Sequence, residues 1–119
     1  MKCGHLGFAV KDLQASKHFY REAFAPIGLS IIGESAQSVR FGADGRTMVF
    51  IHTHTVPGNS LHLAFEVETR GQVDSFYTAA LSAGGKDNGS PGVREHYSPT
   101  YYAAFVIDPD GNNIETVCR

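Results

Sequence analysis

The sequence predicts an α+β fold made of two βαβββ repeats, and the main reason is an internal similarity. Residues 5–10 read HLGFAV and residues 62–67 read HLAFEV, and the two hexapeptides are identical at His, Leu, Phe and Val. The same spacing of 57 residues relates the Phe-Tyr pair at 19–20 to that at 76–77. Similarity at a fixed spacing indicates a duplicated supersecondary unit, so both halves are expected to contain the same elements in the same order.

The first half begins with a strand and a helix. Leu6 and Phe8 alternate with His5 in a pattern of period two, which is typical of a strand with one buried face. Asp12 is a suitable N-cap for the helix that follows, and Gly28 is suited to ending it. Three short apolar runs separated by turn residues are expected to be strands: residues 29–32, 38–42 and 47–53.

The second half is expected to repeat this order. A strand at 62–67 is followed by a helix that starts at Thr69 and ends at the glycines 84–85. The predicted later strands are residues 93–97, 101–107 and 113–118, with a DPDG turn at 108–111 before the last. Residues 53–60 are rich in turn formers and should link the halves, and residues 87–92 are expected to form a loop.

Length and charge restrict the possible functions. The chain has 119 residues and a mass of 12.9 kDa, which predicts one domain over residues 1–119 with repeats at about 4–53 and 61–118. The formal charge of -2 and the sequence pI near 6.3 provide no basic field for nucleic acid or anionic lipid. We therefore expect a small-molecule ligand and neither nucleic acid nor a membrane as partner.

The N-terminal residues do not have the pattern of a targeting segment. MKCGHLGFAV leads directly into an alternating strand pattern and lacks a long apolar stretch with a small-residue cleavage site. No apolar run approaches the length needed to span a membrane. A soluble, cytoplasmic protein is therefore expected.

Three segments together resemble one known superfamily. HLGFAVKDLQASKHFY, the second strand HLAFEV and the terminal DPDGNNIETV are similar to motifs of the vicinal oxygen chelate superfamily, which includes glyoxalase I, extradiol dioxygenases and fosfomycin- and bleomycin-resistance proteins. The resemblance extends over essentially the whole chain. It implies a cupped mixed β-sheet with metal ligands on the first strand of each unit and on the last strand, which here correspond to His5, His62 and Glu115.

This ligand set suits a divalent first-row ion. Neutral imidazole and carboxylate bind Zn, Ni, Mn or Fe, and two His with one Glu leave coordination positions for water or substrate. Glu115 is also the expected catalytic group. Considered alone, a histidine at a strand start such as His5 or His62 is more often partly exposed or hydrogen-bonded than a metal ligand, and Glu115 alone is compatible with a solvated strand residue.

One position departs from glyoxalase I, in which the first unit supplies a second carboxylate opposite the C-terminal glutamate. An alignment of ADG at 43–45 with PDG at 109–111 puts Val49 opposite Glu115, and a shift of one residue puts Phe50 there. Neither side chain is a carboxylate. The classical glyoxalase I reaction, in which the paired carboxylates hold the metal and move the proton, is therefore not expected.

The resemblance also suggests substrate contacts. His96, Tyr97, Tyr101 and Tyr102 surround the implied cup, and the predicted substrate-binding residues are Arg94, Tyr97, Tyr102 and Phe50. Arg94 would hold a carboxylate or phosphonate, although each of these residues is equally compatible with a structural role. His52 and His54 alternate on one strand and form a possible second metal pair, but a third ligand is missing nearby in the sequence, so a structural role is preferred.

The leading functional hypothesis is a metal-dependent enzyme acting on a small oxygenated substrate, by lyase or isomerase chemistry with the metal as Lewis acid. One alternative is an Fe(II) dioxygenase of the extradiol type, because two His and one carboxylate also suit that ion. Another is a metal-free binding or drug-resistance protein with an aromatic groove. A homodimer is expected, because a small chain gains burial by pairing.

Overall fold

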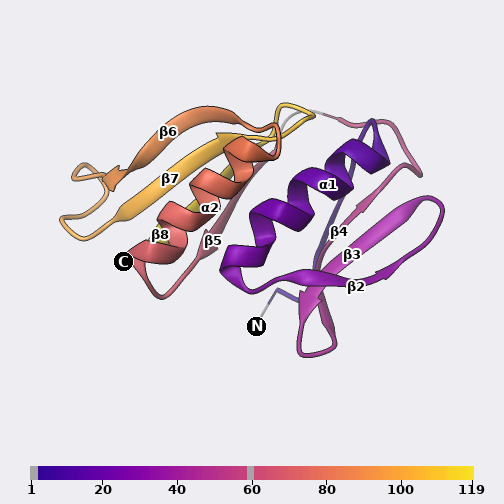
Figure 1. Ribbon diagram of the computed structural model, residues 1–119, viewed down its shortest axis with the longest axis horizontal. Coiled ribbons are helices and arrows are strands. Elements are labelled where there is room, and N and C mark those ends of the chain that lie inside the picture. The colour runs from indigo at the N-terminus through magenta and orange to yellow at the C-terminus, as the bar shows by residue number, and fades with distance from the viewer. Residues whose placement is uncertain (1–2, 59–60) are drawn as a thin grey trace.

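The computed structural model describes residues 3–58 and 61–119 and contains two four-stranded sheets, each with one helix (Figure 1). The first unit consists of β1 (Leu6–Ala9), α1 (Leu13–Phe24), a 3-10 turn (Ala25–Ile27), β2 (Ser30–Glu34), β3 (Ser38–Ala43) and β4 (Arg46–His52). The second consists of β5 (His62–Glu66), α2 (Arg70–Ser82), β6 (Lys86–Val93), β7 (Tyr102–Ile107) and β8 (Asn113–Cys118). The predicted α+β class and the two βαβββ repeats are confirmed.

Each repeat forms its own mixed sheet. The strand orders are β1-β4-β3-β2 and β5-β8-β7-β6. The pairs β1/β4 and β5/β8 are parallel, and the other neighbouring strands are antiparallel. Hereafter these are the first sheet and the second sheet.

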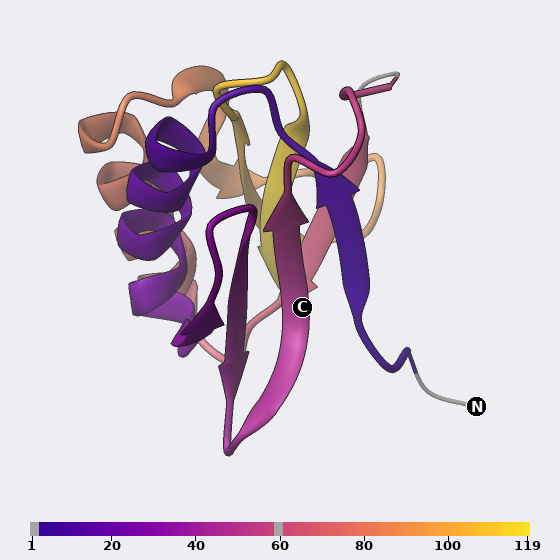
Figure 2. The same cartoon turned by 90° about the vertical axis from the view of Figure 1, so that its right-hand side faces the viewer.

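The helices lie on one side of the strands and the opposite faces are left open (Figure 2). α1 and α2 pack against each other, and the core fills the space between helices and strands. Its largest fully buried side chains are aromatic: Phe19, Tyr20, Phe24, Phe41 and Phe76. Burial of several aromatic rings supplies much of the hydrophobic stabilisation of a domain of this size.

Both helices begin at a capping side chain that is recognisable in the sequence. Asp12 Oδ1 accepts from the backbone N–H of Ala15 at 3.1 Å, which confirms the predicted N-cap of α1. Thr69 and Gln72 form a reciprocal capping box at the start of α2. Gly28 has φ of 90° after the 3-10 turn, a conformation that glycine adopts without strain.

A buried hydrogen-bond network joins the two repeats. The Tyr20 hydroxyl on α1 donates to Asp108 Oδ2 in the turn between β7 and β8, and Tyr20 is completely buried. Asp108 also accepts from the backbone and side-chain N–H groups of Asn112, each at 2.8 Å. Burial and the neighbouring Asp108 raise the pKa of Tyr20 well above its usual value, so the hydroxyl stays protonated and donates.

The prediction for residues 86–97 was wrong in two places. Residues 87–92, expected to be a loop, belong to β6, and residues 94–97, expected to be in a strand, form a turn. Among the strands of the described residues, β6 pairs only with β7, and its register shifts twice, between Asp87 and Gly89 and between Gly89 and Gly92. An edge strand tolerates proline and bulges because one side of its backbone needs no partner, and for this reason turn-like composition is misleading here.

The link between the repeats matches the expectation where it is described. Residues 53–58 contain neither helix nor strand, and the rest of the predicted linker, residues 59–60, lies outside the described residues. In the described part of the chain, neither α1 nor α2 has the length and apolar composition required to cross a membrane.

Candidate metal and substrate site

Four of the candidate site residues lie on the open faces of the two sheets: His5, Phe50, His62 and Glu115. Strand alternation turns alternate side chains away from the helices. His62 and Glu115 are therefore on the open face of the second sheet, where β5 and β8 run parallel with Ala64 opposite Glu115. Glu115 is only 3% exposed, whereas 54% of the His62 side chain is accessible.

Both carboxylate oxygens of Glu115 have partners. His62 Nε2 lies 2.8 Å from Glu115 Oε2, and the Tyr101 hydroxyl donates to Glu115 Oε1 at 2.5 Å. A buried carboxylate is costly unless it is paired and hydrogen-bonded, so these two contacts explain how the chain accommodates Glu115. The arrangement also fixes the orientation of the carboxylate toward His62.

Tyr101 acts as a hydrogen-bond donor in this arrangement. Burial, followed by the hydrogen bond to Glu115 and the charge of Glu115, raises the pKa of Tyr101 to about 12. The Tyr97 ring lies 4.8 Å from the Tyr101 ring, and Tyr97 itself is 60% exposed. In the sequence analysis, Tyr101 was placed near the cup but was not selected as a site residue. Tyr101 and Phe105 are four residues apart, so strand alternation puts their side chains on the same face of the sheet.

Tyr102, which was chosen, lies on the other face of the second sheet. Its hydroxyl donates to Asp74 Oδ1 on α2 at 2.7 Å, and the Arg70 guanidinium lies over its ring. Tyr101 and Tyr102 are adjacent in the sequence, so their side chains point to opposite faces of the sheet. Only the Tyr101 side chain is on the face of Glu115. The structure therefore gives Tyr102 a packing role between β7 and α2.

Arg94 lies over the ring of Phe105 on β7. Its guanidinium donates to the carbonyls of Gly92 at 2.9 Å and Ser90 at 2.8 Å, and it lies 5.3 Å from the centre of the Phe105 ring. Phe105 is directly opposite Glu115 across β7 and β8. Arg94 is thus held by β6 at the border of the site.

The strand register identifies the counterpart of Glu115 in the first repeat. Gly7 pairs with Phe50 as Ala64 pairs with Glu115, so Phe50 occupies the equivalent position. Val49 is equivalent to Ile114 and is buried in the core at 2% exposure, so the alignment through the turns was one residue out of register. The Phe50 ring lies over Gly7, where a Cβ atom would overlap it.

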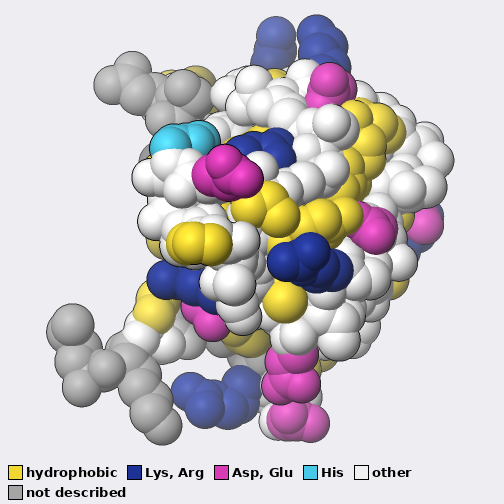
Figure 3. Space-filling view, turned by 90° about the vertical axis from the view of Figure 1, so that its left-hand side faces the viewer, with side chains coloured by type: hydrophobic (Ala, Val, Ile, Leu, Met, Phe, Trp, Pro, Cys, Tyr) yellow, Lys and Arg dark blue, Asp and Glu magenta, His cyan; other side chains and the backbone are white. Residues whose placement is uncertain are grey.

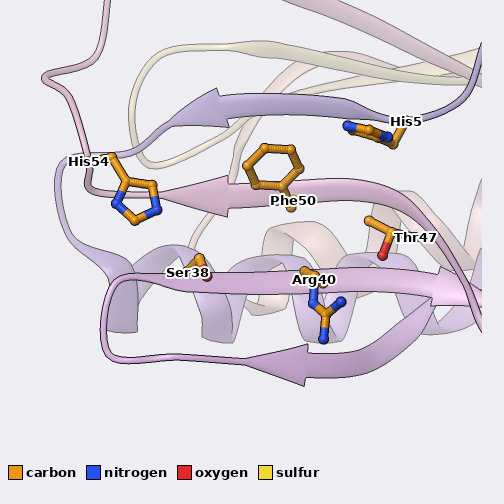
Figure 4. Close-up of a pocket in the computed structure, with 6 residues that line it drawn as sticks. All are labelled: His5, Ser38, Arg40, Thr47, Phe50 and His54. Atoms are coloured by element: carbon orange, nitrogen blue, oxygen red, sulfur yellow. The ribbon is translucent and has the colours of Figure 1, made fainter.

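His5 is on the open face of the first sheet, apart from His62 and Glu115. Its ring centre is 5.7 Å from that of Phe50, and Figure 4 shows Phe50 between His5 and His54. Within residues 3–58 and 61–119, no group of three or more His, Cys, Asp or Glu side chains is close enough to hold a metal. One chain thus brings together His62 and Glu115 but does not add His5, because β1 pairs with β4 and β5 with β8 in separate sheets.

The possible second metal pair has no further ligand in the described residues. The rings of His52 and His54 stack with centres 5.1 Å apart, and His52 also lies 5.5 Å from Phe50. Burial and the neighbouring His54 lower the pKa of His52, so the His52 ring is neutral at neutral pH. These rings extend the aromatic surface begun by His5 and Phe50.

The family follows from a comparison with known families. Residues 2–116 match the model of the glyoxalase/bleomycin resistance protein/dioxygenase superfamily. The chain belongs to this superfamily. A search of curated proteins returned no match.

Solved structures of this superfamily have the same fold. A glyoxalase/bleomycin resistance protein from Albidiferax ferrireducens is 28% identical with a TM-score of 0.81, over 98% of this chain and 97% of that one. A glyoxalase-related enzyme from Fulvimarina pelagi is 18% identical with a TM-score of 0.77, over 100% and 89% of the two chains. A lactoylglutathione lyase from Agrobacterium tumefaciens is 19% identical with a TM-score of 0.69, over 96% and 91%.

The end of the molecule that carries β6 has an apolar surface bordered by charges of both signs. Figure 3 shows apolar side chains near the middle of this end, with Lys or Arg and Asp or Glu interspersed around them. Val93, at the end of β6, and Tyr97, in the following turn, are 38% and 60% exposed. Exposed apolar surface of this kind is suited to contact with a ligand or with a second chain.

Proposed function

We propose that this superfamily member is a homodimeric, metal-dependent enzyme that acts on a small oxygenated organic substrate by lyase or isomerase chemistry. The observation that carries the proposal is the pairing of His62 Nε2 with Glu115 Oε2 at 2.8 Å on an open sheet face. A histidine and a carboxylate held together at an accessible face form two thirds of a common divalent-metal site.

The donor atoms are of the right kind and separation for an ion. His62 Nε2 and Glu115 Oε2 lie 2.8 Å apart, so both atoms would be able to bind one ion. Tyr101 holds the second carboxylate oxygen, as the outer partner of a ligand commonly does. His62 and Glu115 would hold the metal, and we assign the third ligand to His5 of a second copy, since His5 is exposed on the other sheet of its own chain.

A bound divalent ion would act as a Lewis acid that polarises a substrate carbonyl, hydroxyl or epoxide oxygen. The chain supplies the remaining functions. Glu115 is the carboxylate available to accept a proton from the carbon beside that oxygen, and Tyr101 keeps it oriented for this task. Phe50 puts an apolar ring where a second carboxylate would otherwise stand, so the proton transfer depends on one acidic side chain.

One observation favours a second candidate, a metal-free binding protein. The rings of His5, Phe50, His52 and His54 form a continuous aromatic row on the open face of the first sheet. Such a surface binds flat organic molecules without a metal. The buried Glu115 and its pairing with His62 have no use in that role, and for this reason we favour the enzyme.

Metal loading separates these two functions. Protein purified without an affinity tag and dialysed against Zn²⁺, Ni²⁺, Mn²⁺ or Fe²⁺ is expected to retain about one ion per chain, because two His and one Glu form a complete protein ligand set. Elemental analysis measures the content, and His54→Ala serves as a control that leaves it unchanged. Retention of none of the four ions would favour the binding protein, and loss of the ion in the His54 variant would move the site to the other histidine pair.

A further inference from the structure

Beside His5, the open face of the first sheet contains a hollow with a single cationic side chain. The hollow has a volume of about 300 Å³, which is within the range of small-molecule sites. Figure 4 shows the side chains that line it: His5, Ser38, Arg40, Thr47, Phe50 and His54. They include hydrogen-bonding groups and an aromatic wall, and Arg40 is the only Lys or Arg among these six.

The guanidinium of Arg40 has free donor groups. Within the described residues it forms neither an ion pair nor a side-chain hydrogen bond, whereas Arg21 and Arg119 each have a carboxylate partner. Glu34, on the adjacent strand β2, is the carboxylate nearest in register, but it forms its ion pair with Lys17 of α1 at 2.7 Å. A guanidinium presents five N–H donors in a planar fork, and here they remain available to a ligand.

A glycine determines where this guanidinium lies. Gly33 pairs with Arg40 across β2 and β3. A Cβ atom at Gly33 would overlap the guanidinium and would come within 2.8 Å of Cζ and 2.9 Å of Nε. The Arg40 head group therefore lies over the backbone of Gly33, on the β2 side of the hollow (Figure 4), and any side chain at position 33 would displace it.

We propose that this hollow binds the oxyanion head group of a small organic acid. Arg40 contributes the charge and a two-pronged hydrogen bond, as guanidinium groups do for carboxylates and phosphonates. Ser38 and His54 add polar contacts at the same hollow, and the Phe50 ring carries the apolar body of the ligand. Because His5 also lines the hollow, the acid lies beside the proposed metal position, and its assignment as the substrate of the enzyme rests on the proposed function.

The test measures anion binding to metal-free protein, so that it does not depend on the metal. In the presence of EDTA, benzoate, phenylphosphonate and neutral benzamide are titrated by calorimetry. Both anions are expected to bind more tightly than benzamide, and the tighter of the two identifies the head group. In Arg40→Gln the anion affinity is expected to fall about tenfold to hundredfold, as for loss of a charged hydrogen bond, with benzamide unaffected.

Matched variants distinguish a built site from general charge attraction. Arg46→Gln removes the same charge from the start of β4, where the side chain does not line the hollow, and anion affinity is expected to stay within about twofold. Gly33→Ala is expected to weaken anion binding while Gly71→Ala, whose Cβ would make only an ordinary contact with Thr69 at 3.8 Å, leaves it unchanged. Thermal melts establish that all four variants are folded.

Three results would overturn the proposal: equal losses in the Arg40 and Arg46 variants, benzamide binding as tightly as benzoate, or unchanged affinity in folded Arg40→Gln. The proposed function fails by a different result, the lack of metal retention. If the protein retained no metal but bound anions, and this binding disappeared in Arg40→Gln, the acid-binding site would be supported and the proposed enzyme function would be refuted.

Discussion

Glu115→Gln is expected to lose metal affinity by more than about hundredfold while the fold persists, because even the loss of a group that merely orients a ligand costs 10- to 100-fold. Glutamine has the same shape and still accepts the hydrogen bond from Tyr101. It lacks the charge that a divalent ion requires beside the imidazole of His62. Competition with a chromophoric chelator measures the affinity of the wild type and of the variant.

Glu66→Gln is the matched control for this experiment. Glu66 is on β5 of the same sheet, but its side chain is 64% exposed and contacts Arg119 at 3.4 Å. Removal of an exposed, screened charge is expected to leave the metal affinity unchanged. An equal loss in both variants would show that the sheet's general negative charge, and not a site at Glu115, attracts the ion.

Asp108→Ala is expected to destabilise the protein by about 3 to 5 kcal/mol, as does removal of one partner from a buried charged network. The substitution leaves the buried Tyr20 hydroxyl and the Asn112 amide groups without their acceptor. Because Tyr20 is on α1 of the first repeat and Asp108 follows β7 of the second, the substitution also removes a hydrogen bond between the repeats. Urea unfolding followed by circular dichroism measures the free energy of unfolding.

A second tyrosine–aspartate pair provides the control for that loss. Asp74 accepts from Tyr102 at 2.7 Å in the same way, but Asp74 is exposed at the surface of α2. Its replacement by alanine is expected to cost less than about 1 kcal/mol, as surface substitutions usually do. If the Asp108 variant lost no more stability than the Asp74 variant, the buried network would not be what holds the repeats together.

The sequence was sufficient to predict the architecture because the duplicated signal lies where hydrophobic periodicity is strongest. The two hexapeptides became β1 and β5, and the helix start at Asp12 was visible because capping depends on local chemistry. β6 was missed because its strand character comes from pairing with β7, which overrides the Gly- and Pro-rich composition of residues 87–92.

Site details that depend on strand parity or register were harder to predict. β7 has buried residues on both faces, so alternation of polarity does not reveal which of Tyr101 and Tyr102 faces Glu115. The counterpart of Glu115 was also ambiguous, because the turn before β4 is shorter than the turn before β8 and an alignment through the turns moves by one residue. In the sequence analysis, Phe50 was nevertheless one of two possible counterparts of Glu115, the other being Val49.

The partner of His5 depends on how surfaces meet, which a local pattern does not contain. Duplication predicts that His5 and His62 occupy equivalent positions, and they do, each at the start of a repeat and on an open face. Equivalent positions share a pocket only when the repeats are docked with those faces together. In one chain the helices pack together instead, and we therefore assign the third ligand to a second copy.

Mixing two inactive variants tests the shared site most directly. His5→Ala and Glu115→Gln are each expected to bind no metal as pure dimers. After unfolding, mixing and refolding, about half of the dimers contain one chain of each kind, and each has one intact site made of His5 from the Glu115→Gln chain with His62 and Glu115 from the other. Elemental analysis is thus expected to recover about a quarter of the wild-type metal, whereas no recovery in verified mixed dimers, or full metal retention by His5→Ala alone, would contradict this account.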